Sequence, residues 1–247
     1  MLTQEQIDKF NNNGYVIVRG LYTPEEISQI EEWTDEVTHY PEIPGKYMMY
    51  FEESQLQPGK RILSRMEDIE PYHQGFSKLF KGDKMQGAVS DLFGEPAVLF
   101  KDKINFKMPG ADGFRAHQDI QAGWDRYASI HITALVSIDA STLENGCLEL
   151  SPGHHKNGLI GESWKPLKED ALDYIAVPTE PGDAVFFDSF APHRSAPNHT
   201  SAARRVLYVT YNKLSEGDHR QQYYADKRLS YPPDCEREPD KQYVFRV

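Results

Sequence analysis

Cysteine, positive charge and long apolar runs are all scarce in this chain. Only Cys147 and Cys235 are present among 247 residues, too few for a disulfide framework or a cysteine metal cluster, so reduced thiols are expected. The 27 basic residues are outnumbered by 38 acidic ones, and the formal charge of −11 disfavours nucleic acid and anionic membranes as partners. No apolar run approaches a membrane span, and the N-terminal MLTQEQIDKF lacks a signal peptide's apolar core. These absences predict a cytoplasmic protein.

The pattern of residues changes near Ala97. Before it, a capping box at Thr23 predicts a helix with one apolar stripe, and a further helix is expected from about residue 76 to 93. After it come short segments rich in β-branched and aromatic residues, separated by turn signals: AVLFKDKINF, SIHITALVSID, GCLEL, DAVFFD and RRVLYVTY. We expect one domain, mainly β, with helices of about residues 1–95 packed on a sandwich or barrel of about 96–215. The polar, proline-rich tail after Ser215 is predicted to be irregular.

His117 and Asp119 lie two residues apart in the stretch FRAHQDIQAGW. If that stretch is a strand, both side chains point to one face, where they could share a proton, form an ion pair or bind a metal. A histidine and a carboxylate are two of the three ligands in the facial triad that holds non-haem Fe(II). Alone, the pair is better explained as a surface ion pair or a hydrogen-bonded turn. His193, at the end of the apparent strand DAVFFD, is the best candidate for a third ligand.

Arg204 opens the strand that follows His193. A buried arginine in a β-barrel is costly unless it meets an anion, and its planar guanidinium suits a carboxylate held by two hydrogen bonds. Taken with His117 and Asp119, His193 and Arg204 favour a metal site beside an anion-binding arginine. The adjacent Arg205 is expected on the opposite face of the strand, in solvent.

The ordered set of motifs resembles the phytanoyl-CoA dioxygenase family of Fe(II)/2-oxoglutarate-dependent oxygenases. The motifs are HQD at residues 117–119, NGCLELSPGHH at 145–155, HRS at 193–195, and an arginine eleven positions after the second histidine. The resemblance extends over essentially the whole chain. It implies a double-stranded β-helix, a jelly roll of the cupin type, in which His117, Asp119 and His193 bind iron. Arg204, assisted by Ser195, would bind the distal carboxylate of 2-oxoglutarate.

That resemblance also implies the reaction. 2-Oxoglutarate and dioxygen are cosubstrates, succinate and carbon dioxide are formed, and a substrate C–H bond is hydroxylated. Asp119 is present, which disfavours the halogenase variant of the family, in which the carboxylate is absent. The segment 129–155 is most similar to bacterial members that hydroxylate aminoalkylphosphonates such as 2-aminoethylphosphonate.

The substrate is expected to be a small anion. In FKDKINFK, four polar residues alternate with apolar ones, which places Lys101, Lys103, Asn105 and Lys107 on one face of a strand and Phe100, Ile104 and Phe106 on the other. If the basic face looks into the barrel, it forms a receptor for a phosphonate, phosphate or carboxylate. If it looks outward, it is a solvated edge. The candidate substrate-binding residues are Lys103, Asn105, Lys107 and Arg126.

Two other classes of protein remain open at this point. A non-catalytic jelly-roll binding module should have lost a ligand or the arginine, and neither loss is visible. A zinc hydrolase could use His117, Asp119 and His193 with an activated water, but it would not require Arg204 and Ser195. His131, on an apolar strand, is expected to be a hydrogen-bonded sheet residue, and His154 and His155 are expected in a loop. The sequence leaves the oligomeric state open.

Overall fold

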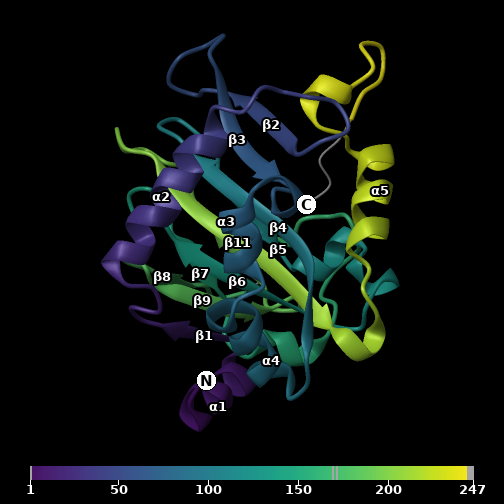
Figure 1. The fold of residues 1–247 in the computed structure, drawn as a ribbon. Helices are drawn as coiled ribbons and strands as arrows, with labels where there is room; N and C mark the ends of the chain where they lie inside the picture. The colour runs from purple at the N-terminus through teal and green to yellow at the C-terminus, as the bar shows by residue number, and fades with distance from the viewer. Residues whose placement is uncertain (1, 169, 171, 244–247) are drawn as a thin grey trace.

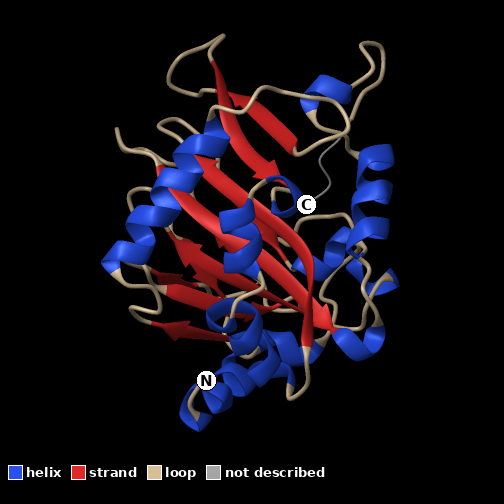
Figure 2. Ribbon diagram, in the orientation of Figure 1, coloured by secondary structure: helices blue, strands red, loops and turns tan. Residues whose placement is uncertain are grey.

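Two antiparallel β-sheets form the centre of the protein, and helices cover the outer face of the larger sheet (Figures 1 and 2). The computed structural model describes residues 2–168, 170 and 172–243. The helices are α1 (Gln4–Asn13), α2 (Pro24–Thr38), α3 (Gln74–Phe80), α4 (Ala88–Phe93) and α5 (Arg220–Ser230). The strands are β1 (Tyr15–Val18), β2 (Met48–Glu53), β3 (Arg61–Glu67), β4 (Ala97–Lys107), β5 (Phe114–His117), β6 (His131–Ser137), β7 (Leu148–Leu150), β8 (Ile175–Val177), β9 (Ala184–Asp188), β10 (His193–Ser195) and β11 (Arg204–Lys213).

The strand order confirms the predicted jelly-roll class. The larger sheet runs β1-β9-β6-β11-β4-β3-β2, and the smaller sheet runs β5-β10-β7-β8. Every pairing in both sheets is antiparallel. From β4 onward the chain crosses several times between the two sheets, and Lys107 of β4 contacts Ser195 of β10 across the interior. The described residues include no helix that is long and apolar enough to cross a membrane.

The helices pack their apolar faces on the outer side of the larger sheet. Thr23 caps α2 as predicted, with its hydroxyl accepting from the Glu26 amide and the Glu26 carboxylate accepting from the Thr23 amide. Ile30 and Phe76 belong to the same buried cluster as Leu207 of β11. Apolar burial of this kind contributes most of the stability of such a layered fold.

The helix expected over residues 76–93 is interrupted. α3 ends at Phe80, Gly82 adopts an extended backbone with φ −79° and ψ 162°, and a π-helical turn at Asp83–Gly87 precedes α4. Glycine loses the most backbone freedom in a helix, so a break costs least there. The break lets both Phe80 and Met85 enter the core.

Two segments differ from expectation. The region of residues 1–95 contains more than helices joined by short strands, because β2 and β3 form a hairpin that extends the larger sheet beside β4. The tail after Ser215 is not irregular, because it contains α5, which lies along the open end of the sheets (Figure 1). Its sequence is polar, but Tyr223 and Tyr224 are buried, so tertiary packing rather than composition stabilises this helix.

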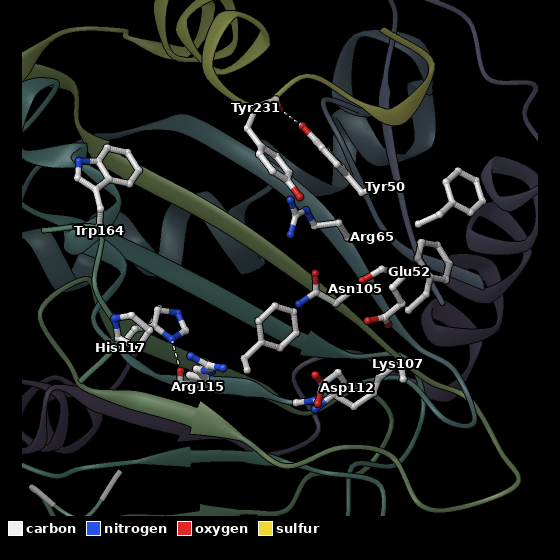
Figure 3. Close-up of a pocket in the computed structure, with 17 residues that line it drawn as sticks. Tyr50, Glu52, Arg65, Asn105, Lys107, Asp112, Arg115, His117, Trp164 and Tyr231 are labelled. Atoms are coloured by element: carbon white, nitrogen blue, oxygen red, sulfur yellow. Dashed lines mark hydrogen bonds between the residues drawn. The ribbon is translucent and has the colours of Figure 1, made fainter. Parts of the chain in front are cut away.

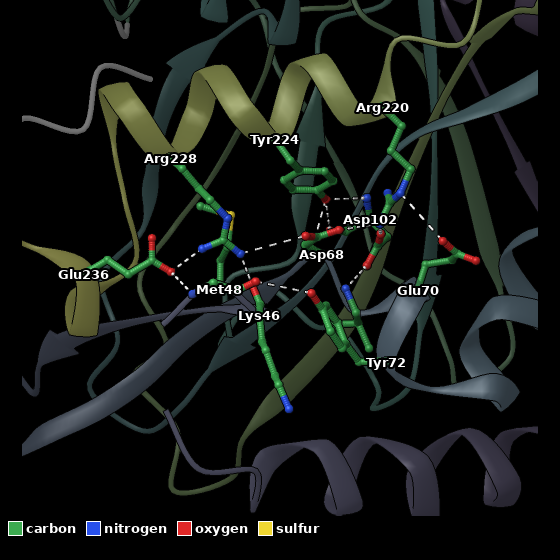
Figure 4. Close-up of polar contacts among 12 residues, drawn as sticks. Lys46, Met48, Asp68, Glu70, Tyr72, Asp102, Arg220, Tyr224, Arg228 and Glu236 are labelled. Carbon is green, nitrogen blue, oxygen red and sulfur yellow. Dashed lines mark hydrogen bonds and ion pairs between the residues drawn. The ribbon is translucent and has the colours of Figure 1, made fainter. Parts of the chain in front are cut away.

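Buried polar contacts fasten α5 to the strands (Figure 4). Arg220 reaches Asp102 of β4 at 2.6 Å and Asp68, just after β3, at 2.8 Å. The Tyr224 hydroxyl donates to the Asp102 carbonyl at 3.0 Å. At the other end of the helix, Arg228 pairs with Glu236. These contacts fix which face of α5 looks toward the sheets.

Phe100 departs from the expected alternation of β4. The pairing with β11 skips it, since Lys101 lies opposite Thr210 and Leu99 lies opposite Tyr211. This β-bulge turns Phe100 toward Trp124 and Tyr223, with which it forms an inner aromatic cluster. Of the three residues predicted on the apolar face of this strand, only Ile104 and Phe106 lie there, packed under the helices.

Replacing Asp188 with asparagine is expected to stabilise the fold at neutral pH. Burial raises the pKa of Asp188 to about 6, although the Phe190 amide donates to its Oδ1 at 2.7 Å. The folded pKa lies above the unfolded one, so the charged carboxylate lowers stability above pH 6, and the wild type regains stability as the pH falls from 6 to 4. Asparagine keeps an acceptor oxygen without the charge, for a gain of about 1–3 kcal/mol at pH 7. Urea unfolding at pH 7 and pH 4 checks this: the gain should vanish at pH 4, and a gain equal at both pH values would contradict it.

Candidate metal and cosubstrate site

The antiparallel pairing of β5 with β10 brings two histidines together. His193 lies directly opposite His117 in this register, and their ring centroids are 4.2 Å apart. Asp119 is not on the strand as predicted, because β5 ends at His117 and Asp119 begins a 3-10 turn that runs to Ala122. One ligand atom from each of the three residues lies within 4.8 Å of the others. The predicted triad is therefore assembled, with its carboxylate supplied by a turn.

Hydrogen bonds to the backbone orient both imidazole rings. The Nδ1 atom of His117 lies 2.7 Å from the carbonyl of Arg115, and that of His193 lies 3.0 Å from the carbonyl of Ala191. Donation from Nδ1 leaves each Nε2 as a lone-pair ligand. Both Nε2 atoms are 3.8 Å from Oδ1 of Asp119, so three donor atoms face one point.

The electrostatics of the three groups suit a cation. Burial lowers the pKa of His117 to about 3 and also lowers the pKa of His193, so both rings are neutral. Burial alone would raise the pKa of Asp119, but the neighbouring His193, His117 and lysines outweigh it and hold that pKa below its usual value. Two neutral imidazoles and one carboxylate are the protonation states that a divalent metal requires.

Gln118, between the two ligands in sequence, faces away from them. Its amide nitrogen donates to the carbonyls of Phe190 at 2.6 Å and Gly158 at 2.8 Å, and its oxygen accepts from the Ile160 amide at 2.6 Å. These bonds tie the ligand-bearing segment to the turn before β10 and to the loop after β7. They fix the backbone on which two ligands sit.

Arg204 lies inside the molecule, with 1% of its surface exposed. Its Nη1 donates to Ser141 Oγ at 3.2 Å, but its Nε has no hydrogen-bond partner among the described residues. Burial lowers the pKa of this guanidinium, which an arginine nevertheless keeps charged. A buried cation with an unpaired donor fits an incoming carboxylate.

Ser195 and Lys107 complete the polar surroundings of this arginine. Lys107 lies opposite Arg204 in the pairing of β4 with β11, and its ammonium donates to Ser195 Oγ at 2.8 Å and to the Ala196 carbonyl at 2.5 Å. Burial, with Arg204 as a second cause, lowers the pKa of Lys107 to about 7. Lys107, predicted to bind substrate, thus lies at the arginine end of the site.

Two neighbouring residues differ from expectation. Arg205 does point away from Arg204, but it is not in free solvent, because it pairs with Asp139 at 2.8 Å and Asp35 at 2.7 Å. His131 is fully buried, and neither ring nitrogen has a hydrogen-bond partner among the described residues; it packs instead on Phe100 and Trp124.

His154 and His155 lie outside the metal-ligand set. They begin a short 3-10 helix, His154–Asn157, rather than an irregular loop. His155 Nε2 lies 3.3 Å from the Asn11 carbonyl, so this turn rests against α1.

The basic face of β4 looks inward, which resolves the alternative left open by the sequence. Lys101 and Lys103 line a cavity of about 440 Å³ together with His117 and Asp119, and Arg126 lies at its rim with 55% of its side chain exposed. Asn105 and Lys107 line an adjoining cavity of about 580 Å³ that also reaches His117 (Figure 3). Burial, with Lys101 as a second cause, lowers the pKa of Lys103 to about 7.

Sequence reasoning missed four residues of the smaller cavity. Arg65 and Glu67 come from β3, and Tyr223 and Lys227 come from α5. A signal is present in ILSRME, where Arg65 and Glu67 lie on either side of the buried Met66, as in a strand, but the segment stands in a region dominated by helix signals. Tyr223 and Lys227 are four residues apart, which places them on one face of a helix.

Solved structures share this fold. EctD from S. alaskensis, crystallised with 2-oxoglutarate and 5-hydroxyectoine, matches with a TM-score of 0.74 at 18% identity, over 87% of this chain and 77% of that one. The epimerase SnoN, in complex with Fe3+, alpha ketoglutarate and nogalamycin RO, matches with a TM-score of 0.73 at 16% identity, over 99% and 95% of the two chains. The jelly roll, the His-Asp-His cluster and the buried arginine together define an Fe(II)/2-oxoglutarate-dependent oxygenase.

Sequence comparison then places the chain more closely. It belongs to the phytanoyl-CoA dioxygenase (PhyH) family, whose model matches residues 10–206. It is 42% identical over 246 residues to the 2-aminoethylphosphonate dioxygenase of uncultured bacterium HF130_AEPn_1, covering 98% of this chain and 93% of the relative. It is 41% identical over 238 residues to the methylphosphonate hydroxylase of Gimesia maris, covering 93% and 88%. The protein is accordingly a dioxygenase that uses iron as its metal cofactor and 2-oxoglutarate and dioxygen as cosubstrates, as predicted.

Proposed function

We propose that this dioxygenase hydroxylates a C–H bond of a small phosphonate. The observation that carries the proposal is the inward basic face of β4, which places Lys101 and Lys103 in one cavity with His117 and Asp119. A buried basic surface in a protein of net charge −11 is a local receptor for an anion. Two relatives named for phosphonate oxidation, each more than 40% identical, support the same substrate class. The candidates are 2-aminoethylphosphonate, its N-methylated relatives and methylphosphonate.

In this proposal the chain holds iron through Nε2 of His117, Nε2 of His193 and the Asp119 carboxylate. Three protein ligands on one side leave the other coordination positions for 2-oxoglutarate and dioxygen. When bound, the metal and 2-oxoglutarate supply the oxidising chemistry, with succinate and carbon dioxide as by-products. The contacts of His117 and His193 with backbone carbonyls keep the ligand nitrogens aimed at one point throughout.

Arg204 has the task of orienting 2-oxoglutarate. Its unpaired Nε and buried charge would bind the distal carboxylate, with Ser195 and Lys107 at hand as further donors. We therefore assign Lys107 to the cosubstrate rather than to the substrate. A zinc hydrolase would have no use for a buried arginine with a free donor, and a binding module would not need the metal ligands as well.

The substrate would occupy the smaller cavity, where Lys103 adjoins Asp119. Lys103 would add positive charge to the wall of this cavity beside the metal site, while Arg126 at the rim would attract the anion from solvent. Asn105 lines the adjoining cavity, where its amide would contact the substrate or 2-oxoglutarate. Aromatic residues, among them Trp124 and Tyr223, exclude water from the reacting carbon.

A substrate screen tests this proposal. Succinate formation by the iron-loaded protein would be measured with 2-aminoethylphosphonate, its N-methylated relatives, methylphosphonate, simple amino acids and phytanoyl-CoA. We expect a phosphonate to stimulate 2-oxoglutarate turnover at least tenfold over the uncoupled rate, because bound substrate completes the site. Stimulation by the acyl-CoA alone would overturn the small-anion proposal, and stimulation by an amino acid alone would reject the phosphonate.

A further inference from the structure

Three buried cations surround a single carboxylate at the end of the smaller cavity. Glu67, 1% exposed, lies on β3. Its Oε1 is 2.9 Å from Arg65 Nε, and its Oε2 is 3.6 Å from Lys101 Nζ and in close contact with Lys227 Nζ. These residues come from β3, β4 and α5, so the cluster forms only where the helix meets the two strands. We call Arg65, Lys101 and Lys227 the cation trio.

The charges of the cation trio are not balanced by the residues around it. Burial would raise the pKa of Glu67, but Lys101, Lys227 and Arg65 together hold it far below its usual value, so Glu67 is ionised. Among the described residues lining this cavity, the other carboxylate is Asp119, which belongs to the metal-ligand set. One anion thus faces three cations in a water-poor site. Buried charge of one sign is costly unless a counter-charge is supplied, and a ligand can supply it.

Aromatic rings line the two lysine side chains and hold their amines in place. Lys101 Nζ lies 5.4 Å from the ring centre of Trp124 and 5.6 Å from that of Tyr223. Lys227 Nζ lies 5.6 Å from the ring of Tyr50. Such contacts fix the direction of each amine, while burial lowers the pKa of Lys227 well below its ordinary value and Glu67 opposes that shift. Both lysines line the same cavity as His117 and Asp119, so an anion that meets them is next to the metal site.

We propose that the cation trio is the seat of the phosphonate group, and that the site provides no carboxylate for a substrate ammonium. This inference rests on the proposed function and deepens it. With all three protonated, Arg65, Lys101 and Lys227 exceed Glu67 by two positive charges, and a phosphonate dianion supplies the counter-charge that favours this protonated state. An ammonium group would approach Glu67 only through three like charges. The seat therefore recognises alkylphosphonates through the phosphonate alone and does not select for an amine.

The anchoring of α5 makes the seat a fixed structure. Arg220 and Tyr224 tie the first turns of the helix to Asp102, while Lys227, one turn further along, enters the cavity (Figure 4). The donors are therefore ordered before a ligand binds, and the free-energy cost of ordering them on binding is small.

Lysine-to-methionine variants test the seat. Lys101→Met and Lys227→Met keep an unbranched side chain that is one atom shorter and remove its charge. Binding of methylphosphonate to the protein loaded with Fe(II) and 2-oxoglutarate would be measured without oxygen by calorimetry, alongside the KM for 2-oxoglutarate. We expect each variant to weaken phosphonate binding at least tenfold and to change the 2-oxoglutarate KM less than twofold. Lys213→Met is the control and should change neither value. Lys213 lies at the far end of β11, where it pairs with Glu95 at 3.1 Å.

Lys101 lies within a strand, so Lys227→Met on α5 keeps the test valid if the strand variant does not fold. A loss of phosphonate affinity smaller than tenfold in the folded variants, or an equal rise in the KM for 2-oxoglutarate, would refute the assignment of the cation trio to the phosphonate group. If the unchanged protein binds phosphonates but does not oxidise them, the seat stands and the proposed reaction fails. If the unchanged protein binds no phosphonate, both fail.

A matched pair of ligands tests the second half of the inference. Propylphosphonate and 2-aminoethylphosphonate have the same chain length and differ by a methyl in place of the ammonium. We expect the unchanged protein to bind propylphosphonate at least as tightly. Tenfold tighter binding of the amine would reveal a carboxylate contact and overturn this half.

Discussion

Replacing His117 with alanine is expected to abolish iron binding and succinate formation while leaving the fold intact. His117 provides one of three donor atoms that lie within 4.8 Å of one another, and its ring faces the cavity rather than a packed core. Two remaining ligands hold a divalent metal far less tightly than three, and the reaction depends on that metal. Asp119→Ala is expected to behave in the same way. Metal analysis and succinate assays, each at saturating 2-oxoglutarate, would measure the loss.

Thermal unfolding of each variant separates loss of fold from loss of metal, and His155 provides a control substitution. His155 contacts the Asn11 carbonyl of α1, so His155→Ala should leave the iron content unchanged. Full activity in His117→Ala or Asp119→Ala would refute the assignment of the triad.

Replacing Arg204 with alanine is expected to raise the KM for 2-oxoglutarate strongly. The guanidinium is buried, its Nε lacks a partner among the described residues, and Lys107 lies opposite Arg204 in the pairing of β4 with β11. Losing one partner of a buried, hydrogen-bonded charge pair costs about 2–5 kcal/mol. That corresponds to a rise in KM of roughly thirtyfold or more. Iron content should stay at the wild-type level, because no metal ligand is touched.

Arg205→Ala provides the matched control from the next position. Arg205 points to the other face of β11 and pairs with Asp139 and Asp35 on the outside of the sheet. We expect its removal to lower the unfolding free energy and to leave the 2-oxoglutarate KM unchanged. Interchanged effects of the two arginines on KM would mean that the strand register is displaced by one residue.

The metal ligands could be predicted because their spacing is local and their chemistry is specific. A histidine and an aspartate two positions apart, a histidine at a strand end and an arginine eleven residues later restrict the chemistry to few choices. The pairing that places His193 opposite His117 depends on sheet topology, which the family resemblance supplied and periodicity alone did not. The turn at Asp119 was missed because a two-residue spacing fits a strand and a tight turn equally well.

The far end of the cavity could not be predicted, because its residues come from segments whose own patterns mislead. Helix α5 is polar in sequence, and it is ordered through Arg220 and the buried Tyr223 rather than through intrinsic propensity. Glu67 lies in a hairpin within a region dominated by helix signals. The bulge at Phe100 depends on a pairing partner more than one hundred residues away. Each feature is decided by contacts between distant segments.

Incorporation of oxygen from 18O2 tests the central claim most directly. The protein, loaded with Fe(II), would be incubated with 2-oxoglutarate and methylphosphonate or 2-aminoethylphosphonate under 18O2, and the products analysed by mass spectrometry. The account predicts a hydroxylated phosphonate carrying one 18O atom, formed in equal amount with succinate that also carries one, because a dioxygenase delivers one atom to each product. Phosphonate recovered unchanged while succinate accumulates at its uncoupled rate would contradict the account.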